Sequence, residues 1–485
     1  MGFDLLLPGV CGCSHHSLLR LLDLGGGLSV HGAAAGRADE PAPFTLPFPV
    51  SAAYNRRMPA PVFPNAAVAS PHYLASSAGL SVLASGGNAA DAAIAMNLVL
   101  AVVYPHMCGL GGDLIAMVWA EDKLHGLNST GRLPAAAEVQ EKVPGRGIGS
   151  VTVPGGVAGL RALRERFGSR DLASLAQPAI DYARRGVPRA PGLSKITEMT
   201  RPLLERDAET ERIFLAPGPL IQTDLAETLG HLSDFYDRVG KRAPQPFTPE
   251  DFAEHKAEWV EPVRTRWRDL DVCEMPPNSR GHLALKALDC LEPLDDLSPG
   301  DAEWHRRLIR ALDPARGDGD TIYLCAMDGD GMAVSLNQSL YQAFGSGVTV
   351  PGTGVLLQNR GAYFKPHQYR PGAKPVHTLA PAMALRGGRP RFVFGTMGGE
   401  AQIQVHLQLL ARVFVAGQEL GEAFAAPRWR FGDSGSLLAE AGLPDLGAQP
   451  MAIPDQAGHA HGILVEADHL VATADPRSDG AALGY

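Results

Sequence analysis

The chain has 485 residues, of which 45% are hydrophobic and 20% are charged, and these proportions are typical of a folded, water-soluble protein. They exclude a disordered chain and a bundle of membrane helices, and the length excludes a small scaffold held together by disulfides. The formal net charge of −9 disfavours nucleic-acid binding, because the chain as a whole would repel a phosphate backbone.

The N-terminal region, residues 1–48, is rich in Gly, Ala and Pro and has little periodicity, so we expect a flexible extension outside the fold. It contains no convincing signal peptide, since Asp4 precedes the short apolar run and Pro8 interrupts it. The six cysteines are scattered apart from Cys11 and Cys13, which favours a reducing compartment. We therefore expect a cytoplasmic protein without membrane association, and a periplasmic or secreted location stays open.

Helices are predicted for most of the first two-thirds of the chain. Leu74 to Leu83 have helical spacing and are followed by Gly86-Gly87, and Asn88 is placed to cap an Ala-rich helix that ends near Val103. That apolar run is shorter than the roughly 20 residues that span a bilayer. Apolar residues at helical spacing predict further helices around residues 157–167, 225–235 and 304–312.

After residue 320 the sequence pattern predicts strands instead of helices. Thr321–Met327 and Met332–Leu340 are joined by Asp-Gly-Asp-Gly, which predicts a hairpin, and alternation in the second run is typical of a half-buried strand. Further strands are expected at Gly354–Gln358, Ala382–Leu385 and Arg391–Phe394, before a helix from about residue 402 to 415. Strands followed by helices that cover them indicate an α+β layered architecture.

Thr321 begins the first of these strands, and its local sequence alone does not indicate a function. The motifs in the rest of the chain make it a candidate functional residue. In chain order the chain contains PHYLAS (71–76), GGNAADAA (86–93), PH (105–106), GLGG (109–112), VPGGVAG (153–159), Thr321 with DGDGMAVS (328–335), FGSG (344–347), GVLLQN (354–359), GTMGG (395–399), DPRS (475–478) and a final GY. This series resembles the γ-glutamyltransferase (glutathione hydrolase) family, and the resemblance extends from about Pro61 to Tyr485.

The resemblance implies an N-terminal nucleophile hydrolase with a four-layer αββα sandwich, made as a precursor that cleaves itself between Asp320 and Thr321. Residues 49–320 would form the large, helix-rich subunit and residues 321–485 the small one. The chemistry requires this cut, because a Thr hydroxyl needs a base, and a free α-amine has a suitable pKa of about 7.7–8.0. Inside a continuous chain that nitrogen is an amide and cannot accept the proton. No metal or organic cofactor is needed.

The resemblance also assigns the groups around the nucleophile. The backbone N–H groups of Gly398 and Gly399 would stabilise the developing oxyanion, and their place between a predicted strand and a helix N-terminus agrees with this role. Ser339 takes the place of a family hydroxyl that could hydrogen-bond Thr321, or it is an ordinary strand hydroxyl.

Residues that hold the γ-glutamyl group in the family are largely replaced. Thr130 corresponds to the Arg that binds the α-carboxylate, and Tyr363 corresponds to the Asp that pairs with the α-ammonium. Tyr341 replaces an Asn, and His377-Thr378 replaces a Ser pair. Losing both ionic partners should weaken γ-glutamyl binding, because charge-assisted hydrogen bonds contribute roughly 1.5–3 kcal/mol each.

Two arginines could bind a different acyl group. Arg360 lies in the segment that lines the family's pocket, and Arg132 is the arginine nearest to Thr130 in sequence. Either could hold an acid-bearing acyl group, or could be an ordinary solvated charge.

The sequence thus predicts an autoprocessed Thr-nucleophile amidohydrolase, for which hydrolysis is favoured over acyl transfer. γ-Glutamyl amides are the substrates that the family name suggests, and an oxamate amidohydrolase-like or cephalosporin/glutaryl acylase-like activity is the alternative. A second alternative is an unprocessed pseudoenzyme with a binding role. The expected partners are a small amide substrate and the two subunits of the same precursor, and a homodimer of processed heterodimers is left open.

Overall fold

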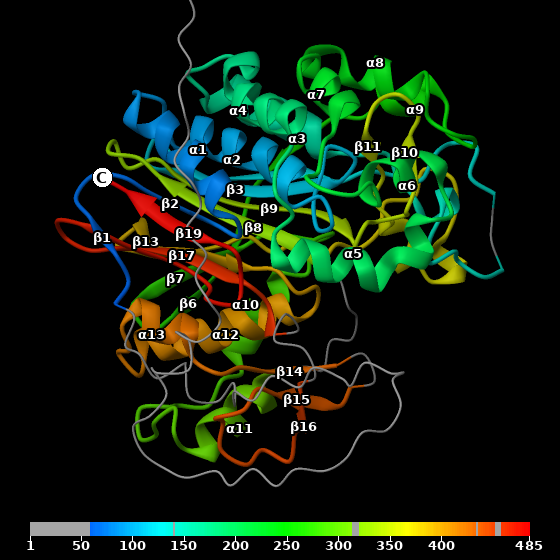
Figure 1. The fold of residues 1–485 in the computed structure, drawn as a ribbon. Coiled ribbons are helices and arrows are strands. Elements are labelled where there is room, and N and C mark those ends of the chain that lie inside the picture. The colour runs from blue at the N-terminus through cyan, green and yellow to red at the C-terminus, as the bar shows by residue number, and fades with distance from the viewer. Residues whose placement is uncertain (1–58, 139–140, 313–319, 433–434, 452–456) are drawn as a thin grey trace, which may run out of the picture. The chain divides into compact units, whose positions relative to one another are not determined.

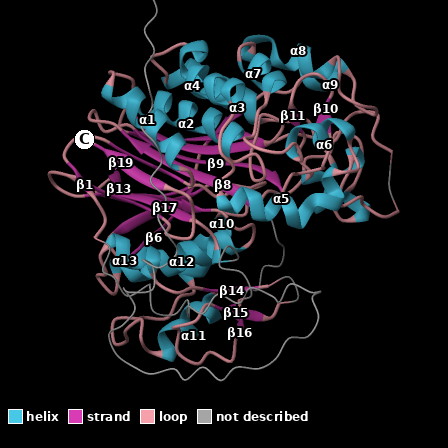
Figure 2. Cartoon of the chain, viewed as in Figure 1, coloured by secondary structure: helices cyan, strands magenta, loops and turns pink. Residues whose placement is uncertain are grey.

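Two β-sheets lie face to face in the computed structural model of the chain, and helices cover the outer face of each sheet (Figure 1). The structure describes residues 59–138, 141–312, 320–432, 435–451 and 457–485, all within one compact unit that spans Asn55–Tyr485. The predicted flexible extension, residues 1–48, lies outside the described residues. In Figure 2 the strands form two inner layers and the helices two outer ones, which confirms the predicted αββα sandwich.

The first sheet contains the predicted hairpin at its centre. Its strands are antiparallel throughout the described residues. In spatial order they are β19 (Ala481–Gly484), β2 (Ala67–Ser70), β8 (Asp320–Met327), β9 (Ala333–Tyr341), β3 (Asp113–Ala120), β4 (Lys123–Ser129) and β5 (Glu258–Val260).

The second sheet is also antiparallel. In spatial order its strands are β1 (Val62–Phe63), β18 (Leu470–Ala474), β17 (Ala460–Val465), β13 (Arg389–Thr396), β12 (Ala382–Arg386), β7 (Leu270–Glu274) and β6 (Val263–Trp267). Short strands outside the two sheets are β10 (Thr349–Val350), β11 (Val355–Leu356), β14 (Trp429–Phe431), β15 (Leu437–Ala439) and β16 (Gln449–Pro450).

The helices fall into two groups. Those on the side of the first sheet are α1 (Tyr73–Ala84), α2 (Ala89–Val103), α3 (Gly156–Phe167), α4 (Leu172–Arg185), α5 (Pro191–Leu204), α6 (Ala208–Phe214), α7 (Thr223–Leu229), α8 (Phe235–Gly240) and α9 (Pro249–Ala253). Those on the side of the second sheet are α10 (His282–Asp289), α11 (Ala302–Ala311), α12 (Ala401–Phe414) and α13 (Leu420–Ala425). Short 3-10 turns are η2 (Ile148–Ser150), η3 (Leu232–Asp234), η4 (Arg360–Tyr363) and η5 (Pro366–Gln368).

Helices α1 and α2 begin and end close to the residues predicted from the sequence. Asn88 caps α2 reciprocally, since its side chain accepts the N–H of Asp91 at 3.0 Å and its own N–H donates to the Asp91 carboxylate at 3.2 Å. Every residue of α2 is buried, because the helix lies between the first sheet and α4 and is apolar on all sides. No described helix has the length and apolar character needed to cross a membrane.

Side chains of β8 alternate between two cores. Ile322, Leu324 and Ala326 join the core under the helices, whereas Tyr323 and Cys325 join the core between the two sheets. The predicted hairpin is confirmed, but β9 is not half-buried: all its residues are buried, because helices cover one face and the second sheet covers the other. Among its polar side chains, Ser335 Oγ lies 3.0 Å from the Tyr323 hydroxyl, and Asn337 Nδ2 donates to the carbonyls of Ile322 and Thr396 at 3.1 and 3.2 Å.

Other expectations needed correction. The expected strand at Gly354–Gln358 shrinks to the two residues of β11. The helix expected around residues 225–235 is broken into α7, η3 and α8, with Gly230 at the end of α7. Strands β3 and β4 were not predicted in the helix-rich part, because nearly every residue of β3 is apolar and buried and the run has no period of two.

Candidate active site

Thr321 sits at the edge of the inter-sheet core, near the start of β8. The β8–β9 register shifts between Asp320 and Ile322, so Thr321 occupies a bulge in the strand, a feature that is common beside active sites. The residue is 1% exposed, and its Oγ has no hydrogen-bond partner among the described residues. Strand β8 runs through the predicted scission point, and in the uncleaved chain the nitrogen of Thr321 is an amide.

Ser339 lies beside Thr321 on the neighbouring strand. Its Oγ accepts the N–H of Tyr341 at 2.7 Å, and the predicted bond to the Thr321 hydroxyl is not formed in this structure. Tyr341 has a φ of +78°, a conformation that costs a bulky residue energy and tends to occur at functional sites. This bond at the end of β9 therefore helps to hold a strained residue next to the Asp320–Thr321 junction.

Gly398 and Gly399 form the turn between β13 and α12. Their φ angles of +121° and +57° suit glycine, and their carbonyls accept the N–H groups of Ala401 and Gln402 at 3.0 and 3.2 Å. Neither glycine N–H donates to a backbone carbonyl within the described residues. These two N–H groups at a helix N-terminus can receive an anion, and their role as oxyanion donors stays a prediction.

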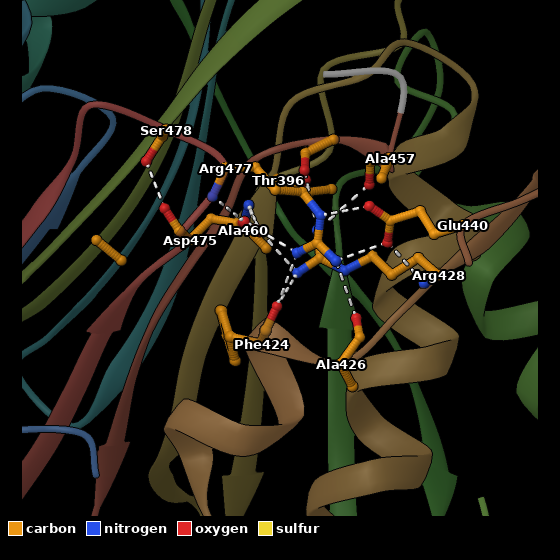
Figure 3. Close-up of polar contacts among 12 residues, drawn as sticks. Thr396, Phe424, Ala426, Arg428, Glu440, Ala457, Ala460, Asp475, Arg477 and Ser478 are labelled. Carbon is orange, nitrogen blue, oxygen red and sulfur yellow. Dashed lines mark hydrogen bonds and ion pairs between the residues drawn. The ribbon is translucent and has the colours of Figure 1, made fainter. Parts of the chain in front are cut away.

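Arg428, Asp475, Arg477 and Glu440 form a buried ion network (Figure 3). Arg428 Nη2 is 2.7 Å from Asp475 Oδ2, and Arg477 bridges Asp475 and Glu440 at 3.1 and 2.6 Å. Burial opposes ionisation of Asp475, but Arg428 and Arg477 outweigh it and hold the pKa of that carboxyl well below its usual range. The network is therefore charged at neutral pH.

The network reaches the glycine turn through the chain at residues 457–459. Arg428 Nη1 donates to the carbonyls of Gly458 at 2.9 Å and Ala457 at 3.3 Å, as Figure 3 shows for Ala457. Met397 N donates to the carbonyl of His459 at 3.1 Å, and a Cβ on Gly398 would lie 3.5 Å from Gly458 Cα. Arg428 thus fixes the segment on which the predicted oxyanion donors rest.

Arg360 occupies a second site, on η4. Its side chain is held by Nε donating to the Val376 carbonyl at 3.0 Å and Nη1 donating to Thr378 Oγ1 at 3.3 Å. The guanidinium carbon lies 4.4 Å from the ring centre of Tyr341 and 4.7 Å from that of Tyr363. The residue is 1% exposed, burial lowers its pKa, and Nη2 has no partner in the described part of the chain.

His377, next to Thr378, is fixed by a carboxylate that sequence reasoning missed. Its Nε2 lies 3.0 Å from Asp113 Oδ2, and Asp113 also accepts the N–H groups of Gly131 and Gly155 at 3.1 and 3.0 Å. Burial, followed by the charge of Arg360, lowers the pKa of His377 to about 4, so the imidazole is neutral at pH 7. With Nε2 donating to Asp113, its buried Nδ1 is a free acceptor within the described residues.

Glu400 was also missed, although it directly follows Gly399. Its carboxylate is 2% exposed, accepts the Tyr363 hydroxyl and lies 2.8 Å from Arg280 Nε, as an ion pair rather than a directed hydrogen bond. Burial raises the pKa of Glu400 and raises that of Tyr363 to about 12. No sequence signal connects Arg280 to this cluster, because its partners are distant in the chain.

An open cavity of about 1140 Å³ adjoins this cluster, and most of its wall is one segment, residues 362–376. We call it the cationic cavity. Its lining residues are Arg132, Arg280, Tyr341, Ala362, Tyr363, Phe364, Lys365, His367, Gln368, Arg370, Pro371, Gly372, Ala373, Lys374 and Val376. Arg132 stands at its rim with its side chain 57% exposed, 3.9 Å from Glu258, and Thr130 is buried and donates to Asn128 Oδ1 at 2.8 Å.

The structure brings most of the predicted site residues together. Tyr341, Tyr363 and Thr378 contact Arg360, and His377 precedes Thr378 in the same strand-like segment. Tyr341 joins the two halves of the site, since it lines the cavity and pairs with Asp320, the neighbour of Thr321. The arrangement combines a buried Thr hydroxyl, two backbone N–H groups at a helix N-terminus and a buried cation, which are groups that acyl transfer on an amide can use.

Comparisons with known proteins agree with this geometry. The family model described as Gamma-glutamyltranspeptidase matches residues 75–313 and 301–485. The Glutathione hydrolase-like YwrD proenzyme of Bacillus subtilis is 33% identical over 86% of this chain and 98% of its own length. The Oxamate amidohydrolase proenzyme of Klebsiella pneumoniae is 32% identical over 86% of this chain and 97% of its own length.

Among solved structures, that of a cephalosporin acylase from Bacillus halodurans is similar, with a TM-score of 0.83 and 28% identity. The match covers 91% of this chain and 99% of the acylase chain, and therefore includes both sheets and both helical layers. The family match spans both sides of the Asp320–Thr321 junction and confirms the resemblance seen in the sequence. The chain belongs to the gamma-glutamyltranspeptidase family and is an amidohydrolase of the N-terminal nucleophile class.

Proposed function

We propose that the enzyme cleaves itself before Thr321 and then hydrolyses amides of small acids whose acyl group carries a second, free carboxylate. The observation that carries this proposal is the buried Arg360, whose Nη2 has no partner among the described residues. Burial lowers the pKa of this guanidinium although the charges of Glu400 and Asp113 oppose the effect, and a substrate carboxylate would supply the missing charge-assisted hydrogen bond to Nη2.

Maturation requires only groups near the junction. Thr321 Oγ attacks the carbonyl carbon of Asp320, the C–N bond breaks, and the nitrogen takes up a proton to become the α-amine. Water then hydrolyses the resulting ester, which frees the Thr321 hydroxyl and leaves Asp320 as a carboxylate. The unpartnered Oγ in the precursor is available for this attack, and the two relatives described above are both named proenzymes.

Turnover repeats the same attack on the substrate. The new α-amine takes the Thr321 proton as Oγ bonds to the substrate carbonyl carbon, and the same proton passes to the leaving amine. The N–H groups of Gly398 and Gly399 stabilise the oxyanion, a contribution worth roughly 10²–10³ in rate for one donor. Water then hydrolyses the acyl-enzyme ester and releases the acid.

The charges around Arg360 favour a carboxylate without an adjacent ammonium. The carboxylates whose charges act on Arg360 are Glu400 and Asp113. Both are already engaged, Glu400 with Tyr363 and Arg280, and Asp113 with His377 and the N–H groups of Gly131 and Gly155. The ammonium of a γ-glutamyl group would thus find no free acidic partner there. The similarity to an oxamate amidohydrolase and to a cephalosporin acylase supports this substrate class.

γ-Glutamyl amides are the second candidate substrates. They are favoured by the 33% identity to a glutathione hydrolase-like proenzyme. An unprocessed pseudoenzyme with a binding role is the third reading, and it predicts a single 51.3 kDa band that persists on incubation.

The test compares anilides that differ by one group. Glutaryl nitroanilide differs from γ-glutamyl nitroanilide only in lacking the ammonium, and butyryl nitroanilide lacks the carboxylate as well; oxamate is assayed by ammonia release. We expect kcat/KM to be highest for the glutaryl compound, and Arg360→Met to raise its KM at least about tenfold, the cost of one charge-assisted hydrogen bond. Arg389→Met, an exposed arginine of the β12–β13 hairpin, is the control and should leave KM unchanged.

Other outcomes are informative. Faster turnover of the γ-glutamyl anilide would overturn the proposed acyl specificity in favour of the second candidate. An uncleaved chain without amide hydrolysis would establish the pseudoenzyme.

We also propose a cytoplasmic location. The described cysteines, Cys108, Cys273, Cys290 and Cys325, are all free thiols, as in proteins of reducing compartments. Fractionation of the native cells with an antibody tests this, and recovery outside the cytoplasm would contradict it.

A further inference from the structure

We propose that the cationic cavity is a subsite for the amine portion of the substrate, and that the preferred amides release an amine bearing two or more carboxylates. This inference rests on the proposed function, because it assumes that Arg360 holds the acyl group. It adds the chemical class of the leaving amine, for which neither the nucleophile nor Arg360 provides a determinant.

The first support is the excess of positive charge on the cavity wall. Five cationic side chains line it, namely Arg132, Arg280, Lys365, Arg370 and Lys374, and the described lining has no acidic residue. Three of the five have carboxylates behind them: Arg132 and Lys374 share Glu258, and Arg280 pairs with Glu400. Five cations and two carboxylates leave an excess of three positive charges, which attracts a polyanion.

The second support is that two of these cations are unused. Lys365 and Arg370 are exposed on the segment 362–376 and form no ion pair with any described residue. Lys374, on the same segment, has a side chain only 16% exposed, 3.6 Å from Glu258, and burial lowers its pKa. The partly buried ammonium of Lys374 is stabilised by an added carboxylate, and the exposed Lys365 and Arg370 attract anions to the same wall.

The third support is the order in which Arg360, the two tyrosine rings and the cavity follow one another from the protein interior outward. Arg360 lies behind the rings of Tyr341 and Tyr363, and both rings also face the cavity. Thr321 adjoins Asp320, the ladder partner of Tyr341. If the acyl group extends from Thr321 to Arg360, it lies on the inner side of the tyrosines, and the amine is the part of the substrate left to enter the cavity.

The size of the cavity agrees with this assignment. Its volume of about 1140 Å³ exceeds the roughly 300–1,000 Å³ of pockets that hold drug-sized ligands. A small diacid would leave it nearly empty. An amine with several carboxylates, such as an acidic amino acid or an acidic peptide, could contact Lys365, Arg370 and Lys374 together.

The experiment compares two amides with the same glutaryl acyl group and the same ring. One releases aminoisophthalate, a dianion, and the other releases aminoisophthalamide, its neutral counterpart. We expect kcat/KM to be at least about tenfold higher for the dianion, mainly through KM, and this preference to shrink in about 0.5 M NaCl, where exposed charges are screened. In the double variant Lys365→Glu/Arg370→Glu the ratio should fall to about one or below.

The controls separate charge at this wall from charge elsewhere. Lys286→Glu changes an exposed lysine on α10, away from the cavity lining, and should keep the full preference for the dianion. Because Lys365 and Arg370 are exposed, the double variant should still fold, and cleavage of its precursor checks this.

Each remaining outcome decides the question. Equal kcat/KM for the two amides, or a preference that survives in the double variant, would overturn the subsite while leaving the proposed function intact, provided that hydrolysis still depends on Arg360. If neither glutaryl amide is hydrolysed by the cleaved enzyme, the proposed function fails and the subsite fails with it.

Discussion

The region proposed to perform the reaction and the region proposed to select the substrate are built differently. Thr321 and Ser339 lie on central strands of the first sheet, and Gly398-Gly399 follow a central strand of the second. Arg360 to Thr378, in contrast, lie outside the strands of both sheets, on 3-10 turns and connecting chain. The proposed reaction would thus depend on backbone that both sheets fix, whereas the proposed substrate choice would depend mainly on side chains of one connecting segment outside the sheets.

The largest expected effect comes from a change at Thr321, which should remove the reaction but keep ligand binding at Arg360. Thr321→Ala should abolish both precursor cleavage and amide hydrolysis, because no hydroxyl remains to attack, yet it should still bind glutarate through Arg360. Electrophoresis, N-terminal sequencing and calorimetric titration measure the three properties. Thr321→Ser is the matched control and should keep partial cleavage. Amide hydrolysis by a chain with an intact Asp320–Thr321 bond would refute the mechanism.

The next effect tests the backbone donors. At the Gly398 φ of +121° an alanine is strained although its Cβ has room, so Gly398→Ala should displace the donor N–H and lower kcat by roughly 10²–10³. KM should change little, because Arg360 is untouched. Gly387→Ala, at φ +58° in the β12–β13 hairpin, imposes a similar strain elsewhere and should leave kcat unchanged. A kcat for Gly398→Ala close to that of the native enzyme would exclude these N–H groups as donors.

A third test addresses the support of the glycine turn. Arg428→Met removes the partner of Asp475 and the donor to Gly458, and breaking a buried pair typically lowers the free energy of unfolding by about 3–5 kcal/mol. Urea denaturation measures this, with Arg389→Met as the control for loss of an exposed arginine. A loss below about 1 kcal/mol, the usual worth of a surface ion pair, would show that the network does not stabilise the turn.

The smallest expected effect concerns pH. The pKa of His377 is lowered to about 4 in the folded protein and is about 6.5 in the unfolded chain, so between these values the unfolded state binds more protons and stability falls as the pH falls. The stabilisation of the folded protein that comes from the lowered pKa of His377 is complete above about pH 6.5 and is lost as the pH falls toward 4.

His377→Gln should flatten the dependence of unfolding free energy on pH by up to about 1.4 kcal/mol per pH unit in this window. Urea denaturation at several pH values from neutral to acid gives the two slopes. Identical slopes for the native and variant proteins would show that His377 is not held neutral by its surroundings.

Local sequence signals predicted much of the fold. Asn88 marked the start of α2, and the Asp-Gly-Asp-Gly turn placed β8 and β9 correctly, because caps and tight turns are decided by a few adjacent residues. β3 escaped prediction because a strand buried on both faces has no alternation of polar and apolar residues.

The site was only partly predictable for a related reason. The family resemblance supplied Thr321, Gly398 and Arg360, but Asp113 meets His377 across 264 residues of chain. Nor does anything near Glu400 in the sequence indicate that Tyr363 and Arg280 would bind it. Such pairs arise from the packing of the layers, which the pattern of a single segment does not encode.

The position of strand β8 between strands from both sides of the predicted cut affects how the mature enzyme holds together. It lies between β2, which precedes the predicted cut, and β9, which follows it, and the C-terminal strand β19 pairs with β2 on the other side. In the second sheet β7 pairs with β12 across the same division. After scission the two polypeptides would stay interwoven through shared ladders, so neither could leave the other without unfolding, and activation would be a one-way event.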